Sequence, residues 1–142
     1  MPRGDISAVK SKAKNGKSFL ESILVSGLFG YRGMGIKMLV QGAPKVLYFD
    51  TEQARSNTAK MAKRIYTMSG WDINYNKYDL FRMYSLRTMS TDERVEYIKK
   101  EIGARQPDFV VIDGISDLIE DFNNIEQSNN IVGEMMRLSA EY

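Results

Sequence analysis

The segment that decides the fold is KAKNGKS, residues 12–18. An apolar-alternating run, ISAV at residues 6–9, precedes it, and an amphipathic run, FLESIL at residues 19–24, follows it. A strand, a Gly-Lys-Ser loop and a helix in this order form the context that a phosphate-binding loop requires. The backbone N–H groups of such a loop and the N-terminus of its helix together create a concave, positively polarised surface that binds phosphate.

This context predicts a chemical role for each residue of the loop. A lysine at the position of Lys17 reaches the β- and γ-phosphates of a nucleotide, and a hydroxyl at the position of Ser18 binds Mg²⁺. We therefore expect ATP and Mg²⁺ as ligands, with Lys17 as a catalytic residue and Ser18 as a metal ligand. The residues expected to surround the phosphates are Ala13, Lys14, Asn15, Gly16, Lys17, Ser18 and Phe19.

The loop departs from the general pattern G-x-x-x-x-G-K-[ST] at its first position, where this chain has Ser11. Serine is small enough for the turn, although a positive φ at this position would strain it. The alternative is a lysine-rich, solvated turn at the start of a helix. The strand before the loop and the helix after it favour nucleotide binding.

Length and composition narrow the class of protein. The chain of 142 residues suffices for a single domain with a hydrophobic core. It contains no cysteine and no histidine, which excludes disulfides, thiol chemistry, histidine metal ligands and a Ser-His-Asp triad. The net charge of +2 is too small to indicate nucleic-acid binding by itself. No run of residues reaches the length of a membrane span, so we expect a cytoplasmic protein without a membrane partner.

Strand-like and helix-like segments alternate along the chain. Strands are expected at residues 5–10, 46–49, 80–86 and 109–112, and helices at residues 17–30, 54–69, 92–105 and 127–142. We expect the apolar side chains of the first helix to share one face, which Phe19, Leu20, Ile23, Leu24, Leu28 and Phe29 form. We expect Thr91 to cap the third helix. The alternation predicts an α/β fold, a three-layer sandwich in which helices cover both faces of a mostly parallel sheet.

Acidic residues follow two of the apolar strands, at the edge where parallel sheets bind ligands. Asp113 comes directly after FVVI, residues 109–112, which is the Walker B pattern, and we expect its carboxylate to hold Mg²⁺. Asp50 and Glu52 come directly after VLYF, residues 46–49. Glu52 is the candidate for orienting the attacking water, and Asp50 for supporting the metal or the turn. The alternative is that Thr51 or Asp50 caps the next helix.

These motifs together resemble the N-terminal part of a RecA-like P-loop ATPase domain, as found in replicative helicases and in RepA-like ATPases of plasmids and mobile elements. The matching segments are GDI at residues 4–6, KNGKS at 14–18, VLYFDTEQ at 46–53 and VVIDGISDL at 110–118. The resemblance implies that the counterpart of Glu52 polarises the attacking water. It also implies that hydrolysis is coupled to work on DNA in a homo-oligomeric ring or filament, where a neighbouring subunit supplies an arginine finger.

The resemblance further implies that the chain is incomplete at its C-terminal end. In this family the next strand carries a polar sensor and inserts between the P-loop strand and the Walker B strand. Arginine-finger and DNA-binding elements follow that strand. Residue 142 precedes all of them, so we expect a truncated domain with a gap in its sheet beside residues 109–112.

Three other interpretations remain open. A partition ATPase similar to ParA and MinD would use Lys12 as its signature lysine, but Ala13 and Lys14 replace the two glycines of that family. Its P-loop and Walker B strands are direct neighbours, whereas one strand separates them in the RecA-like class. The domain is alternatively a non-catalytic module for nucleotide binding or protein interaction. A small-molecule kinase is less favoured, because no arginine-rich lid segment stands out.

Overall fold

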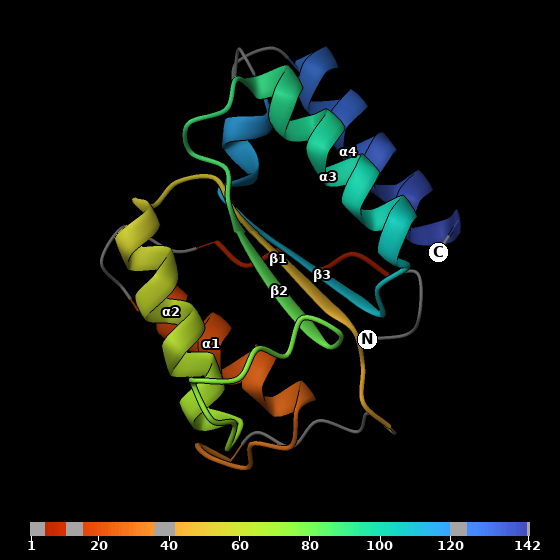
Figure 1. The fold of residues 1–142 in the computed structure, drawn as a ribbon. Helices are drawn as coiled ribbons and strands as arrows, with labels where there is room; N and C mark the ends of the chain where they lie inside the picture. The colour runs from red at the N-terminus through yellow and green to blue at the C-terminus, as the bar shows by residue number, and fades with distance from the viewer. Residues whose placement is uncertain (1–4, 11–15, 36–41, 120–124, 142) are drawn as a thin grey trace.

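The computed structural model describes residues 5–10, 16–35, 42–119 and 125–141. Its elements in chain order are α1 (Lys17–Leu28), β1 (Val46–Asp50), α2 (Arg55–Met68), β2 (Phe81–Ser85), α3 (Thr91–Arg105), β3 (Phe109–Asp113), the 3-10 helix η1 (Ile115–Leu118) and α4 (Ile125–Glu141). Helices α1 and α2 cover one face of the sheet, and α3 and α4 cover the other (Figure 1).

The sheet has the strand order β2-β1-β3, and both pairs of neighbouring strands are parallel. Their register places Asp50 beside Ser85 on one side and Asp113 on the other, so the three strands end at the same edge. All five residues of β1 are buried, as expected for a central strand that is covered on both faces. The predicted α/β sandwich with a parallel sheet is therefore confirmed.

Alternate residues of β1 face two separate hydrophobic cores. Leu47 and Phe49 pack with α3 and α4, whereas Val46 and Tyr48 pack with α1 and α2. Complete burial of one large apolar side chain stabilises a fold by about 1.5–3 kcal/mol, so both cores hold β1 firmly in its register. This buried central strand leads directly into the acidic turn that follows it.

The N-terminus of α3 has a cap one residue earlier than predicted. Ser90 Oγ accepts a hydrogen bond from the backbone N–H of Glu93 at 3.3 Å, and Glu93 Oε2 accepts one from the N–H of Ser90 at 2.8 Å. This reciprocal pair is a capping box, which satisfies two N–H groups that the helix leaves free. The predicted cap, Thr91, is therefore wrong, and Thr91 is the first residue of the helix.

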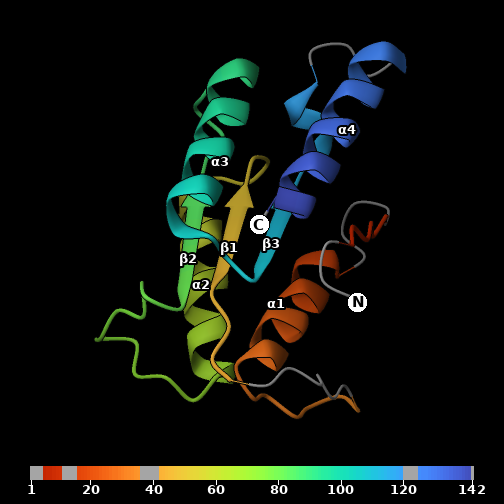
Figure 2. The ribbon, with the colours of Figure 1, turned by 90° about the vertical axis from the view of Figure 1, so that its right-hand side faces the viewer.

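The predicted strand at residues 5–10 is also wrong. These residues have no regular secondary structure, and Ile6 and Val9 are 47% and 55% exposed. Figure 2 shows residues 5–10, in red, on the far side of β3 from β1 and set apart from β3. An alternating run becomes a strand only where a neighbouring strand pairs with its backbone groups. Within the described ranges, β3 has a strand neighbour on one side only.

The predicted buried face of α1 is correct only in the C-terminal half of the helix. Ile23 and Leu28 are buried, but Phe19 and Leu20 are 48% and 38% exposed. The C-terminal half packs against α2 and β1, whereas the first turn points to the edge where the strands end.

Among the described helices, none is both long enough and apolar enough to cross a membrane.

Candidate functional site

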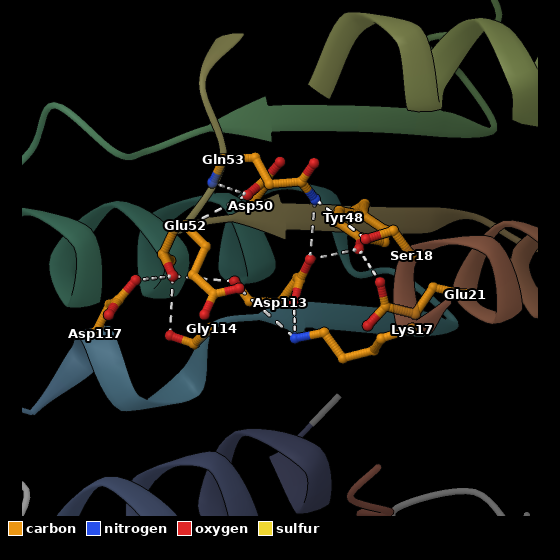
Figure 3. Close-up of polar contacts among 11 residues, drawn as sticks. Lys17, Ser18, Glu21, Tyr48, Asp50, Glu52, Gln53, Asp113, Gly114 and Asp117 are labelled. Atoms are coloured by element: carbon orange, nitrogen blue, oxygen red, sulfur yellow. Dashed lines mark hydrogen bonds and ion pairs between the residues drawn. The ribbon is translucent and has the colours of Figure 1, made fainter. Parts of the chain in front are cut away.

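The candidate site lies where β1 and β3 end and α1 begins (Figure 3). Gly16 immediately precedes α1 with a φ of +78°, a left-handed conformation that glycine adopts without strain. Lys17 and Ser18 then occupy the first two positions of the helix. Three of the residues expected to surround phosphate, Ala13, Lys14 and Asn15, lie outside the described residues.

Lys17 links the helix to both strand ends. Its Nζ lies 2.5 Å from Asp113 Oδ1 and 3.7 Å from Glu52 Oε2. Burial acts to lower the pKa of Lys17, but its contact with Asp113 and the charge of Glu52 outweigh burial and raise the pKa above its ordinary value. Lys17 is therefore charged, as a residue that binds phosphate must be.

Asp113 is the carboxylate at the centre of the site. It is 2% exposed, and its Oδ2 lies 3.3 Å from Gln53 Nε2 and 3.4 Å from the Tyr48 hydroxyl. Within the described part of the chain, its Oδ1 has no hydrogen-bond partner beyond the ion pair with Lys17. A buried carboxylate oxygen with this spare capacity is suited to a cation or to a water molecule that a cation binds.

Ser18 and Asp113 supply oxygen atoms of the kind that Mg²⁺ prefers. The amide of Gln53 spans the two residues, because its Nε2 lies 3.4 Å from Ser18 Oγ as well as 3.3 Å from Asp113 Oδ2. Among the described residues, no group of three acidic, histidine or cysteine side chains could hold a metal ion without help. This donor set fits Mg²⁺, which keeps several waters and binds proteins through few side chains and the phosphates of a ligand.

The fully buried Asp50 carboxylate stabilises the turn after β1. Its Oδ1 accepts hydrogen bonds from the N–H groups of Glu52 and Gln53 at 3.2 and 2.9 Å, and its Oδ2 accepts one from the Thr58 hydroxyl at 2.7 Å. Both oxygens therefore already have protein partners. The geometry favours the turn-supporting role that the sequence allowed for Asp50 over direct contact with a metal ion.

Glu52 belongs to this turn, and its side chain is 52% exposed. Its carboxylate is 3.7 Å from Lys17 Nζ, so it faces the position where the lysine would contact a terminal phosphate. Here a carboxylate can accept a hydrogen bond from a water molecule that attacks the phosphate.

Thr51 connects the ends of β1 and β3. Its Oγ1 lies 2.8 Å from the carbonyl oxygen of Gly114, 3.0 Å from that of Asp113 and 3.0 Å from Asp117 Oδ2. Gly114 has a φ of +90°, and a Cβ atom at this position would lie 2.3 Å from Thr51 Oγ1. This close approach requires glycine directly after Asp113.

Phe19 is the last of the residues expected to surround phosphate. Its backbone N–H donates a hydrogen bond to the carbonyl of Gly16 at 3.0 Å, so a phosphate oxygen would have to share this donor. The exposed ring lies beneath Arg64, whose guanidinium carbon is 5.7 Å from the ring centre. This distance is typical of a cation–π contact between α1 and α2.

Three polar residues of the site were missed in the sequence: Glu21, Tyr48 and Gln53. The Tyr48 hydroxyl donates a hydrogen bond to Glu21 Oε2 at 2.7 Å. Burial is the main cause that raises the pKa of both Glu21 and Tyr48. The available signal was spacing, because Glu21 follows Ser18 by three positions and therefore shares its face of the helix.

Comparison with known protein families decides the class of this domain. A family model described as an AAA domain matches residues 1–140. The chain belongs to the AAA domain family. As an AAA domain it is a nucleotide-binding domain of the P-loop ATPase type, in agreement with the parallel sheet and the Gly-Lys-Ser sequence at the start of α1. No match was found among curated proteins or among solved structures.

Proposed function

We propose that this AAA domain binds ATP together with Mg²⁺ and hydrolyses the bond between the β- and γ-phosphates. The observation that carries the proposal is the convergence of Lys17, Asp113 and Glu52, with Lys17 Nζ 2.5 Å from one carboxylate and 3.7 Å from the other. Lys17 holds the β- and γ-phosphates, and the backbone of residues 13–19 surrounds them. Ser18 and Asp113 hold the metal ion, and Asp50 supports the turn that carries Glu52.

Lys17 has to exchange partners when the nucleotide binds. In the structure its ammonium group neutralises the buried carboxylate of Asp113. A lysine that moves to the phosphates leaves this carboxylate without a counter-charge, and an unpaired buried charge is strongly destabilising. A magnesium ion held by Ser18 and Asp113 would supply the replacement charge for this carboxylate and would help to neutralise the charge on the phosphates.

Glu52 orients the water for hydrolysis. Its carboxylate accepts a hydrogen bond from the water as the water oxygen attacks the γ-phosphorus. The bond between the γ-phosphorus and the bridging oxygen breaks, ADP leaves with that oxygen, and Glu52 takes up the proton of the water. General-base help of this kind contributes about 10²–10⁴-fold to a rate.

We infer further that the domain is RecA-like and works as a helicase- or RecA-like motor in DNA replication, mobilisation or repair, as part of a homo-oligomer. Two observations support this class over a partition ATPase. Within the described residues, the strand neighbour of β3 is β1, and residues 5–10 lie apart from β3 rather than beside it (Figure 2). A partition ATPase would place its P-loop strand directly against the Walker B strand.

Phosphate release from Mg-ATP, with and without single-stranded DNA, tests both parts of the proposal. We expect release to require Mg²⁺ and to increase with DNA. Nucleotide binding without release would instead support the second candidate, a non-catalytic nucleotide-binding module, which the pairing of β3 on one side only, within the described residues, also favours. Release that DNA does not change would retain the ATPase and contradict the DNA-dependent role.

A further inference from the structure

We propose that Tyr48 and Glu21 form a positioning pair that fixes helix α1 against the Walker B carboxylate and thereby sets the span of the Mg²⁺ site. The inference rests on the proposed function, because it concerns the residues that hold the metal ion. Neither residue is assigned a contact with the phosphates. Both act through Asp113 and through the helix that carries Ser18.

The Tyr48 hydroxyl is the point where three elements meet (Figure 3). Tyr48 is the middle residue of β1 and is fully buried. Its hydroxyl donates a hydrogen bond to Glu21 Oε2 of α1 at 2.7 Å and lies 3.4 Å from Asp113 Oδ2 at the end of β3. One oxygen atom therefore contacts both the helix that begins with the phosphate-binding residues and the strand that ends with the metal-binding carboxylate.

The distances rank the two contacts of the hydroxyl. A phenol has one proton to donate, and 2.7 Å is the usual length of a good O–H···O hydrogen bond, whereas 3.4 Å is longer than such bonds normally are. The proton therefore belongs mainly to the bond with Glu21. Asp113 is in contact with the same oxygen, so any movement of the tyrosine ring changes the space around its carboxylate.

The helix geometry links this pair to the metal site. Glu21 follows Ser18 by three positions and Lys17 by four, so all three side chains lie on one face of α1. Fixing Glu21 to Tyr48 therefore fixes the first turn of the helix. Ser18 Oγ then keeps its distance from Asp113, which the register of the sheet holds in place beside Asp50.

The pair matters most once a nucleotide is bound. Among the described residues, three other contacts link α1 to the strand ends: the ion pairs of Lys17 with Asp113 and with Glu52, and the amide of Gln53 between Ser18 and Asp113. All three use groups that the proposed function assigns to the phosphates or the metal ion, so all three are given up on binding. The hydrogen bond between Tyr48 and Glu21 uses neither group and is retained.

The test is the metal-dependent part of nucleotide affinity. Calorimetric titrations with ADP, once with Mg²⁺ and once with EDTA, give two dissociation constants. The dissociation constant in EDTA divided by the dissociation constant with Mg²⁺ is the ratio that measures how much the metal ion contributes to affinity. Loss of an outer partner of a metal ligand typically costs about 10–100-fold in metal affinity, so we expect Tyr48→Phe to lower this ratio by about 10-fold. The affinity in EDTA should stay unchanged.

Two further variants separate positioning from folding. Glu21→Ala removes the acceptor from a half-exposed helix position and leaves the buried ring in place, and it should lower the ratio in the same direction. Glu21→Gln keeps an acceptor oxygen for the hydroxyl and should restore most of the ratio. In an Asp113→Asn background, Tyr48→Phe should have no additional effect on the ratio.

A matched control exists on the neighbouring strand. Tyr84 of β2 also donates a hydrogen bond to a glutamate, Glu101, at 2.5 Å, but it packs on the opposite face of the sheet. Tyr84→Phe should leave the ratio unchanged. An unchanged ratio in both Tyr48→Phe and Glu21→Ala, or an equal loss of affinity with and without Mg²⁺, would overturn the inference. Wild-type protein that does not bind ADP under either condition would contradict the proposed function itself.

Discussion

Replacing Gly114 with alanine tests whether the close contact between the ends of β1 and β3 holds the site together. Gly114 directly follows Asp113, and its backbone carbonyl accepts a hydrogen bond from the Thr51 hydroxyl at 2.8 Å. The contact therefore joins the turn that carries Glu52 to the strand that carries Asp113. A methyl group at this position would enter the space that Thr51 occupies.

Two costs add at this position. Gly114 has a φ of +90°, and a left-handed conformation costs an ordinary L-residue about 1–2 kcal/mol. The new Cβ atom would lie 2.3 Å from Thr51 Oγ1 and 3.1 Å from Glu52 Cγ, and overpacking of a tight site costs about 1–3 kcal/mol. We therefore expect Gly114→Ala to lower the free energy of unfolding by about 2–5 kcal/mol.

Urea denaturation followed by circular dichroism measures this change. The matched control is Gly70→Ala, because Gly70 also has a positive φ, +70°, but a Cβ atom there would meet no other atom within 4 Å. The control should lose only the backbone term, about 1–2 kcal/mol. If Gly114→Ala loses no more stability than Gly70→Ala, the clash between a Cβ atom at position 114 and Thr51 does not destabilise the fold, and the reasoning is refuted.

Three further predictions concern catalysis, the metal ion and pH. Glu52→Gln should bind Mg-ATP normally and slow phosphate release by about 10²–10⁴-fold; an unchanged rate would exclude Glu52 as the water-orienting residue. EDTA should weaken ATP binding by the wild-type protein in calorimetry but have little effect on Asp113→Asn, and equal weakening in both would reject Asp113 as a metal ligand. Burial acts to raise the pKa of Glu101, but hydrogen bonds from Tyr84 and Arg105 outweigh burial and lower the pKa below the ordinary 4.5. Ionised Glu101 therefore stabilises the fold above about pH 4.5, and this contribution disappears as the pH falls through the lowered pKa. Urea denaturation of Glu101→Gln should show a deficit at pH 7 that shrinks at pH 3, and a deficit that does not depend on pH would contradict this reasoning.

The sequence predicted the elements whose pattern is strong and whose partners are in the described structure. β1 and β3 appear within one residue of the expected ranges, because a continuous apolar run between turn residues is distinctive of a buried parallel strand. Residues 5–10 have an alternating apolar pattern that also predicts a strand, but they do not form one. Their backbone groups would need a neighbouring strand, which sequence periodicity cannot supply.

The residues of the candidate site also differ in how far the sequence could predict them. Residues at the end of a strand or the start of a helix, such as Lys17 and Asp113, could be found from motifs, because local sequence fixes where they lie. Tyr48 could not, because a tyrosine within an apolar strand is indistinguishable from an ordinary core residue. Its partner Glu21 looks like the polar side of an amphipathic helix, and only the packing of α1 on β1 brings the two together.

The most direct test of the proposed phosphate site is Mg-ATP binding by calorimetry on the wild-type protein, on Lys17→Ala and on Lys60→Ala. Lys60 is an exposed lysine of α2 and controls for the loss of one positive charge. If the loop binds phosphate through Lys17, the wild-type protein and Lys60→Ala bind with the same affinity and Lys17→Ala loses binding. Equal affinity of Lys17→Ala and the wild-type protein would contradict the phosphate-binding role of the loop and the proposed ATPase function.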